Sequence, residues 1–592
     1  MGLYQNYTRP LREKLVRGWP GLVDKHDVIV VGAGPGGCAA AYYLAKRGYD
    51  VLLVEKAKVP GQRNVTGGVL YGSYIPGYGL IDLIPDFEKE APLERRVVRY
   101  RLAMISSPRY PGEYRYRAIS PNARAYRVLE IGEDSFLDRF IHRGISTGHD
   151  YTVIRAKFDR WFARKVEEAG GIVVTATAVE DLVIEGDKVV GIRTNREELY
   201  ADLIIDASGV TSSLVIRAGL RPPLDPSRVY HGVKQVYQLS EDEINRRFGL
   251  KSGEGMAIAI MGDFLHGMIG GGFIYTNRDT VSVGIVVTME SMVRGLRDNV
   301  RTNGKPLDVL EEMTSHPYVR RYIEGAKLVE YSAHNIPKGY RTMLEKPLRS
   351  GFLVVGDALG AFVKIGGLID GMRRAIATGI MAAQAYIYAR KHHDFSEKTL
   401  AVYLDLLEPI YRDIRRSARN SKISETRLLY GPGYRVLLTI LGRLETAVIP
   451  EEPNGRDAIQ RIQERTGLLT YEEDKRYSHI KIYYGGANRD PYKMWVPACP
   501  VNCYTISVPG KGIFASYRDL YLYNLERLRR AGRSGGDAEK EALRETWRDV
   551  ARAEVRFDHV ACISCGTCWV IGYPNIIYNP ERDGHGVKFR YS

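Results

Sequence analysis

Three cysteines near the end of the chain, Cys562, Cys565 and Cys568, are each separated by two residues. This spacing is typical of loops that ligate a [4Fe–4S] cluster through thiolate sulfur. Such a cluster takes four thiolates, and in the common bacterial run the fourth belongs to a Cys-Pro pair that follows three residues later. Position 572, where that cysteine would stand, is Gly572. The sequence therefore predicts a cluster whose fourth ligand comes from another segment.

An upstream Cys-Pro pair, Cys499-Pro500, is the predicted source of that ligand. In a two-cluster ferredoxin, each cysteine triplet takes its fourth ligand from the Cys-Pro of the other motif. Counted back from Cys499, the three positions that would complete a second cluster hold no cysteine. The losses thus remove one whole cluster and keep all four ligands of the other, which are Cys499, Cys562, Cys565 and Cys568. Cys503 is a rival ligand, but no proline follows it, and we expect it to pack in the core.

Residues 27–56, "DVIVVGAGPGGCAAAYYLAKRGYDVLLVEK", carry a dinucleotide-binding fingerprint in its expected context, between an apolar strand and an alanine-rich helix. Gly32 permits the tight turn, Gly34 lets the backbone approach a pyrophosphate, and Gly37 lets helix and strand pack closely. Glu55 ends the next strand, where its carboxylate can accept hydrogen bonds from ribose hydroxyls. The contacts predicted from this segment are Gly32, Gly34, Pro35, Gly36, Gly37, Glu55 and Lys56.

Two further segments indicate that the dinucleotide is FAD. Residues 351–362, "GFLVVGDALGAF", read as a strand that runs into Gly356 and Asp357, and a carboxylate there suits the ribityl chain of a flavin. Residues 203–214, "LIIDASGVTSSL", read as a third strand that ends in a glycine turn at Gly209. The sequence has no second G-x-G-x-x-G, so we infer one FAD and no bound nicotinamide.

Several motifs occur in the order found in the electron-transfer-flavoprotein:quinone oxidoreductase family. They are "GQRNVTGGVLYG" (61–72), "YTVIRAKFDRWF" (151–162), "GVKQVYQL" (232–239), "GGGFIYTN" (270–277) and "GDALGAFVKIGGLIDGM" (356–372). The chain most resembles the Fix-type dehydrogenase subunit over residues 27–430. The resemblance implies an α/β fold of the glutathione-reductase-like FAD-binding type with an inserted quinone-binding β-sheet region.

The resemblance also implies roles for individual residues. Thr66, Gly67 and Gly68 would contact the flavin, Arg155 would contact its phosphate or ribityl region, and Gly371 would begin a helix whose N-terminus faces reduced flavin. Val179 is a further expected cofactor contact. Gly270, Gly271 and Phe273 would line a quinone pocket. The redox cofactors carry the chemistry, and the sequence has no Ser/His/Asp or Cys/His constellation that predicts a catalytic nucleophile.

Residues 476–592 resemble the ferredoxin-like partner of the Fix-type subunit, down to the closing "GHGVKFRYS". The expected domains are an N-terminal extension (1–26), the FAD-binding domain (27–430), a membrane-interface helix and linker (431–475) and an α+β ferredoxin-like [4Fe–4S] domain (476–592). Within the last of these, residues 517–556 read as two charged helices around a glycine turn. They form either a solvated hairpin, which we favour, or a docking surface.

The composition bears on partners and location. The 85 basic and 70 acidic residues give a formal net charge of +15, which favours an acidic partner, an anionic lipid surface or nucleic acid. No stretch is long and apolar enough to span a bilayer, so we expect a peripheral protein on the cytoplasmic face of the membrane. Residues 428–449 read as an apolar helix interrupted by Arg435 and Arg443, which either lies in the membrane interface or packs against the FAD domain.

We therefore predict an oxidoreductase that passes electrons from a reduced electron-transfer flavoprotein to a membrane quinone through the cluster and FAD. Menaquinone is favoured over ubiquinone. The chain is expected in a hetero-oligomeric complex, and a donor of the bifurcating, NADH-dependent kind is favoured. One alternative is a geranylgeranyl reductase-like enzyme that saturates isoprenoid lipids. Another is a non-catalytic electron carrier or nucleic-acid-binding subunit, which we disfavour because the arginines are scattered.

Overall fold

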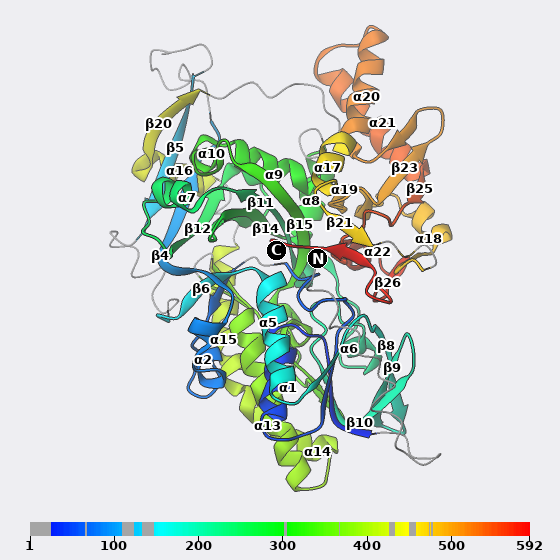
Figure 1. The fold of residues 1–592 in the computed structure, drawn as a ribbon. Coiled ribbons are helices and arrows are strands. Elements are labelled where there is room, and N and C mark those ends of the chain that lie inside the picture. Colours follow the sequence, from blue (N-terminus) through cyan, green and yellow to red (C-terminus); the bar gives the residue numbers. More distant parts are fainter. Residues whose placement is uncertain are drawn as a thin grey trace.

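The computed structural model describes residues 25–65, 68–108, 123–132, 147–300, 305–365, 368–425, 432–448, 458–472, 474 and 477–592 (Figure 1). Two large sheets form the body of the protein, and a C-terminal part lies beside them. None of the helices in these ranges is both long and apolar enough to cross a membrane.

The first sheet has eight strands and an α/β arrangement. Its core strands are parallel and their facing residues are almost wholly apolar, as expected for a sheet covered on both faces. The path runs through β16 (Leu348–Arg349), β17 (Phe352–Val354), β10 (Glu198–Asp206), β1 (Lys25–Val31), β2 (Val51–Val54) and β7 (Ile172–Val174), and the hairpin β8 (Val179–Glu185) and β9 (Lys188–Thr194) extends β10.

Three helices pack against this sheet: α1 (Pro35–Ala45), α5 (Arg155–Glu168) and α13 (Met372–Lys391). Helix α1 packs along α13, and the N-termini of these two helices lie near the strand ends of the sheet. The two helices touch closely because glycines face each other, since a Cβ on Gly379 would lie 2.2 Å from the carbonyl oxygen of Gly36. This contact fixes the start of α13 beside the glycine turn.

The second sheet has ten strands and is mostly antiparallel. Helices α8 (Met289–Asp298) and α9 (Pro306–Ser315) pack on β11 and β14. The strand order is β15 (Lys327–Pro337), β11 (Val229–Gln238), β14 (Thr280–Thr288), β13 (Gly270–Thr276), β12 (Glu254–Gly262), β4 (Leu93–Ile105), β5 (Ala123–Ile131) and β20 (Arg443–Val448), with β6 (Asp150–Val153) joining β4 to β3 (Val69–Tyr71).

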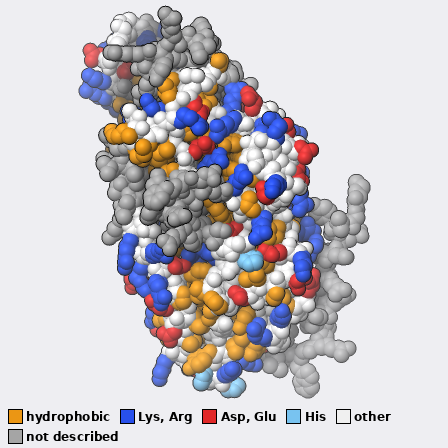
Figure 2. Space-filling model, turned by 90° about the vertical axis from the view of Figure 1, so that its left-hand side faces the viewer, with side chains coloured by type: hydrophobic (Ala, Val, Ile, Leu, Met, Phe, Trp, Pro, Cys, Tyr) orange, Lys and Arg blue, Asp and Glu red, His pale blue; other side chains and the backbone are white. Residues whose placement is uncertain are grey.

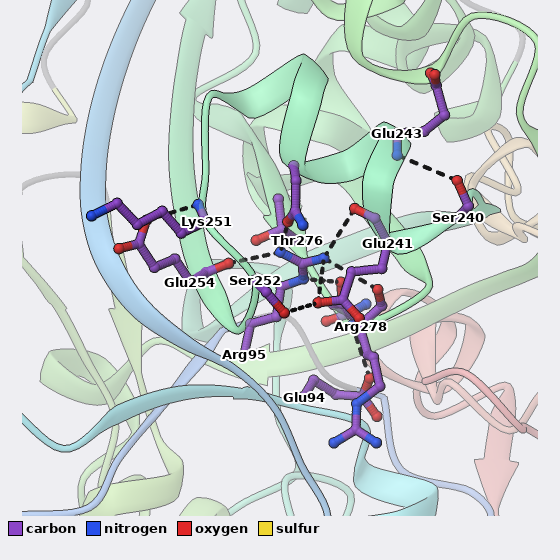
Figure 3. A network of polar contacts seen from close by, with 12 residues as sticks. Glu94, Arg95, Ser240, Glu241, Glu243, Lys251, Ser252, Glu254, Thr276 and Arg278 are labelled. Carbon is purple, nitrogen blue, oxygen red and sulfur yellow. Dashed lines mark hydrogen bonds and ion pairs between the residues drawn. The ribbon is translucent and has the colours of Figure 1, made fainter.

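A buried guanidinium closes one end of this sheet (Figure 3). Arg95 is 2% exposed, and its Nε donates to the carbonyl oxygen of Asn277 at 2.7 Å. One Nη donates to Asn245 Oδ1 at 2.6 Å and to the carbonyl oxygen of Glu254 at 2.8 Å. Because these acceptors belong to α7 (Glu241–Phe248), β12 and the β13–β14 turn, one side chain of β4 holds three other segments together.

The C-terminal part lies on the right of Figure 1, in yellow, orange and red. It combines small antiparallel sheets with short helices, and a helical hairpin projects from it. Its elements are β21 (Thr470–Glu472) with β27 (Gly586–Lys588), β22 (Ile480–Ile482) with β26 (Ile576–Tyr578), β23 (Tyr504–Val508) with β24 (Gly512–Phe514) and β25 (Glu554–Phe557), and α18 (Tyr484–Arg489), α19 (Trp495–Ala498) and α22 (Thr567–Gly572).

The two helices expected within 517–556 are α20 (Tyr517–Arg530) and α21 (Gly535–Arg552). A buried polar group joins them, in which Lys511 Nζ lies 2.8 Å from Asn524 Oδ1 and 2.7 Å from Asp549 Oδ2. The remaining elements are α2 (Leu80–Leu83), α3 (Phe87–Glu90), α6 (Leu214–Arg217), α10 (Pro317–Ile323), α11 (Gly339–Thr342), α12 (Gly356–Leu359), β18 (Val363–Ile365), β19 (Leu368–Asp370), α14 (Glu397–Leu400), α15 (Val402–Ser424) and α17 (Ala458–Thr466).

The single helix expected over 428–449 is wrong. Within the described residues the helix α16 covers Pro432–Leu441, and Arg443–Val448 form β20, which pairs with β5. Gly442 separates the two elements. Polar and apolar residues alternate after Gly442, as in an edge strand. The apolar composition of the whole segment obscured this signal.

Candidate functional site

A long cavity lies where the first sheet meets the second. Its walls come from the strand ends β1, β2 and β10, from the starts of α1 and α13, and from β3 and β15. The predicted cofactor contacts that line it are Gly32, Gly34, Pro35, Gly36, Glu55, Lys56, Gly68, Arg155, Val179, Gly209, Asp357 and Gly371. Gly37 lies behind this wall, and Thr66 and Gly67 lie outside the described residues.

The glycine turn has the geometry that a pyrophosphate needs. Gly32 has φ +102°, and a Cβ there would lie 2.6 Å from the carbonyl oxygen of Ala207. A Cβ on Gly37 would lie 2.0 Å from the carbonyl oxygen of Gly32, so strand and helix can approach only without side chains. Gly34 caps α1 without any side-chain hydrogen bond, which leaves the first amides of the helix free for an anion.

Glu55 sits at the end of β2 with both carboxylate oxygens engaged. Oε2 accepts a hydrogen bond from the Ala33 amide at 2.9 Å, and Oε1 accepts one from the Ala57 amide at 2.8 Å. A carboxylate has about four lone-pair sites, so each oxygen can accept one more donor. Glu55 therefore orients the turn and also presents acceptors to the cavity.

Arg155 and Asp357 set the charge in the middle of the cavity. Arg155, the first residue of α5, pairs with Asp159 at 2.8 Å. Burial raises the pKa of Asp357 to about 6, although the Arg155 guanidinium opposes that shift. Nearby, burial lowers the pKa of His334 to about 4, and the charge of Arg155 adds to this effect, so the imidazole is neutral at pH 7.

Five cysteines meet in the C-terminal part. Cys499, Cys503, Cys565 and Cys568 are buried, and Cys562 is partly exposed. The Cys503 amide lies 3.4 Å from Cys499 Sγ, and the Ser564 amide lies 3.4 Å from Cys562 Sγ. A hydrogen bond from the Cys503 thiol lowers the pKa of Cys499 to about 7, and the same thiol hydrogen-bonds with Cys562. The structure therefore brings the four predicted ligands and their rival to one place.

The grouped thiols are soft donors of the kind that an iron–sulfur cluster takes. Within the described ranges, no three His, Cys, Asp or Glu residues are arranged to hold one metal ion. A [4Fe–4S] cluster attaches each thiolate to a different iron, so its ligands need not converge on a point. The Tyr504 hydroxyl hydrogen-bonds with the Cys568 thiol, and the buried Ser564 Oγ has no hydrogen-bond partner among the residues that the structure describes. Soft sulfur donors with polar groups around them fit the cluster.

Both cysteine segments contact the second sheet, and the triplet segment also contacts the wall of the long cavity. Tyr331 of β15 donates to the carbonyl oxygen of Pro500 at 3.0 Å. The Thr567 hydroxyl lies 3.3 Å from Cys565 Sγ and 3.0 Å from His231 Nδ1 of β11. A Cβ on Gly566, which has φ +75°, would lie 2.7 Å from Thr211 Cγ2, and Thr211 lines the cavity. The two sites thus share a wall.

Comparison with known proteins identifies the family. Residues 27–280 match the family described as FAD dependent oxidoreductase. "Probable electron transfer flavoprotein-quinone oxidoreductase YdiS" of Escherichia coli K12 is 33% identical over 76% of this chain and 97% of its own length. The chain belongs to the electron transfer flavoprotein-quinone oxidoreductase family. It is therefore an oxidoreductase whose cofactor is FAD.

Other relatives agree with this family. Protein FixC of Escherichia coli K12 is 36% identical over 66% of this chain and 84% of its own length, and Protein FixC of Bradyrhizobium diazoefficiens is 35% identical over 66% and 83%. A geranylgeranyl bacteriochlorophyll reductase-like protein from Thermoplasma acidophilum has a similar fold, with a TM-score of 0.52 and 20% identity over 71% of this chain and 91% of its own.

The predicted quinone residues lie on β13 and do not line the long cavity. Phe273 is buried and stacks on Tyr275, with ring centroids 4.9 Å apart. A Cβ on Gly270 would lie 2.2 Å from the carbonyl oxygen of Val286, and one on Gly271 would lie 2.9 Å from that of Ile260. The close approach of the neighbouring strands is thus one reason why glycine occupies both positions.

The sequence analysis missed part of the cavity wall. Tyr578 and Pro580, from the C-terminal part, line the cavity with His334 and Ile336 of β15. The Tyr578 hydroxyl accepts a hydrogen bond from Lys56 Nζ at 3.2 Å. Tyr578 reads as an ordinary strand residue, so no local signal could have placed it in a cavity that begins at Gly32.

We expect Glu55→Gln to weaken FAD binding by about 10- to 100-fold, because hydrogen bonds to charged groups contribute about 1.5–3 kcal/mol. Fluorescence titration of the apoprotein with FAD measures the change. Glu198→Gln, on an exposed strand end outside the cavity, is the control and should bind FAD normally. Unchanged affinity in Glu55→Gln would show that Glu55 serves the turn alone.

Proposed function

We propose that the chain is an electron-transfer-flavoprotein:quinone oxidoreductase that works in a complex with its electron-transfer flavoprotein. It would take electrons from the reduced flavoprotein and deliver them, by way of one [4Fe–4S] cluster and FAD, to a membrane quinone, with menaquinone favoured. The observation that carries this proposal is the shared wall, in which Gly566 beside the cysteines meets Thr211 of the long cavity. Such proximity suits two redox centres that exchange electrons.

In this proposal the long cavity holds FAD. The amides at the start of α1 would bind the pyrophosphate, and Glu55 would accept from the ribose. The start of α13 at Gly371 would face the flavin ring, where the positive end of the helix favours negative charge. Arg155 would contact the phosphate or ribityl region. Each role follows from a residue that lines the cavity.

The cysteine group would hold the cluster through Cys499, Cys562, Cys565 and Cys568, in the ferredoxin-like domain proposed for residues 476–592. The surrounding chain would keep water from the sulfurs, because all but Cys562 are buried. Lys305, which is fully buried, donates to the carbonyl oxygens of Val496 and Cys499 at 2.9 and 3.3 Å and so ties this segment to the start of α9.

The quinone would approach from the β13 side. Val69 lines the long cavity and also packs in one apolar cluster with Phe273 and Tyr275. This cluster gives an apolar surface beside the proposed flavin ring, suited to a quinone headgroup. Gly270 and Gly271 would expose backbone groups there, as expected for the family.

A membrane-facing surface would bring the enzyme to its quinone at the cytoplasmic face. On α16, Val436, Ile440 and Leu441 are 57%, 72% and 53% exposed, whereas Leu438 is buried. Figure 2 faces the side on which α16 and β20 lie in Figure 1, and it shows apolar side chains gathered among lysines and arginines. Such a mixture suits an anionic lipid surface.

The direct test uses the chain in liposomes with a reduced electron-transfer flavoprotein from the same organism and either menaquinone or an unsaturated isoprenoid lipid. We expect quinol to form and the isoprenoid to remain unsaturated. Saturation of the isoprenoid without quinol formation would instead favour a geranylgeranyl reductase-like activity, which the shared fold permits.

We expect serine at Cys499, Cys562, Cys565 or Cys568 to abolish the electron paramagnetic resonance signal of the reduced cluster, because oxygen replaces thiolate poorly on iron–sulfur iron. Cys503→Ser is the matched control, since the same substitution is made in the same group, and it should keep the signal. If Cys499→Ser kept the cluster and Cys503→Ser lost it, Cys503 and not Cys499 would be the fourth ligand.

We expect Val436→Ser, Ile440→Ser and Leu441→Ser together to release the protein from anionic liposomes, since each buried CH₂ contributes about 0.8 kcal/mol. Reduction of a long-tailed quinone should slow, and that of a short-tailed analogue should not. Ile513→Ser with Leu522→Ser, both exposed in the C-terminal part, is the control. Full liposome binding by the triple variant would place the membrane contact elsewhere.

A further inference from the structure

A buried histidine contacts one of the proposed cluster sulfurs. His479 Nε2 lies 3.2 Å from Cys562 Sγ, and His479 is 6% exposed. A thiolate bound to iron carries no hydrogen and can only accept, so the proton must be on Nε2 and the imidazole must be the donor. Hydrogen bonds between N–H groups and anionic acceptors are stronger than those between neutral groups.

The backbone around His479 holds the ring in this position. His479 directly precedes β22, whose Ile480 pairs with Tyr578 of β26. The amide of Asn579 donates to the carbonyl oxygen of His479 at 2.8 Å. The imidazole packs edge-on against the Tyr578 ring, with centroids 6.0 Å apart and planes at 81°. The contact with Cys562 is therefore fixed by a strand pair and an aromatic neighbour.

Cys562 differs from the other cysteines of the group. It alone among the five is partly exposed, and besides the Cys503 thiol its sulfur contacts the Ser564 amide at 3.4 Å and the His479 ring at 3.2 Å. The imidazole thus contacts the most exposed of the five cysteines. It can thus both limit the access of water to this sulfur and stabilise negative charge on it.

We propose that His479 is a positioning residue that orients Cys562 and raises the reduction potential of the cluster. Reduction adds negative charge, part of which resides on the cysteine sulfurs, so a fixed N–H donor stabilises the reduced state more than the oxidised state. The inference rests on the cluster of the proposed function. It goes further because it names the side chain that tunes the cluster.

The same histidine is coupled to the flavin side of the shared wall. Tyr578, on which the imidazole packs, lines the long cavity and accepts a hydrogen bond from Lys56. Lys56 also donates to Glu581 at 2.7 Å. His479 thus contacts both a proposed cluster sulfur and a residue that lines the cavity proposed for FAD, so loss of its N–H donor would change the difference in reduction potential between the two centres.

The test is a redox titration of the full chain, with the cluster followed by electron paramagnetic resonance and iron and FAD contents measured in parallel. His479→Leu removes the donor and should shift the cluster midpoint potential to a more negative value. His479→Gln can place an amide N–H near the position of Nε2 and should restore most of the shift. His479→Asn is too short to do so and should resemble the Leu variant.

His559→Leu is the matched control, because its ring lies 6.4 Å from that of His479 and its Nε2 faces the carbonyl oxygen of Asp474 at 3.3 Å. Its potential should equal that of the wild type. Equal potentials in the wild type, His479→Leu and His479→Asn would overturn the inference. So would equal shifts in the Leu, Asn and Gln variants, which would indicate packing and not a hydrogen bond.

The titration also separates this inference from the function on which it rests. A wild-type protein without any cluster signal would overturn the proposed cluster, and the tuning role with it. A normal wild-type signal with an unshifted potential in His479→Leu would overturn the tuning role alone. If the Leu variant loses iron, the Gln and Asn variants test the tuning role. A more negative potential in His479→Asn than in His479→Gln supports it, and equal potentials overturn it.

Discussion

The position of the C-terminal part depends on one buried carboxylate. Glu581 is 3% exposed and pairs with Lys56 at 2.7 Å and with Arg63 at 2.6 Å. Burial alone would raise the pKa of Glu581, but the charges of Lys56 and Arg63 outweigh burial and lower it. A buried carboxylate without such partners costs several kcal/mol. Both cations follow the dinucleotide turn in the sequence, whereas Glu581 belongs to the C-terminal part. The two ion pairs therefore form only when these parts of the chain are docked.

That docking explains why the cysteine group and the long cavity can share a wall. Thr567, Pro500 and Gly566 each contact a residue of the FAD-binding part, and at Gly566 a side chain would collide with Thr211. The positive φ of Gly566 and the lack of space around its Cα both favour glycine. Glycine is thus needed in the cysteine loop for contact with the neighbouring part as well as for the turn itself.

The sequence could predict what is local. The turn at Gly32 and the triplet at Cys562 depend on neighbours within a few residues, and the structure has the predicted turn and brings the cysteines together. The roles of Tyr578 and His479 depend on contacts with distant segments, so spacing could not reveal them. The prediction for the segment around Gly442 was wrong for another reason. Its apolar composition fits a helix and an edge strand equally well, and pairing with β5 decides between them.

The cavity is built from segments at opposite ends of the chain, and this has a consequence for the order of assembly. Lys56 and Tyr578 are 522 positions apart, so a ribosome that adds about 5–20 residues per second makes the second roughly half a minute to two minutes after the first. During that interval the glycine turn can fold, but one wall of the cavity does not yet exist. The long cavity is therefore complete only after the C-terminal part has folded against the FAD-binding part.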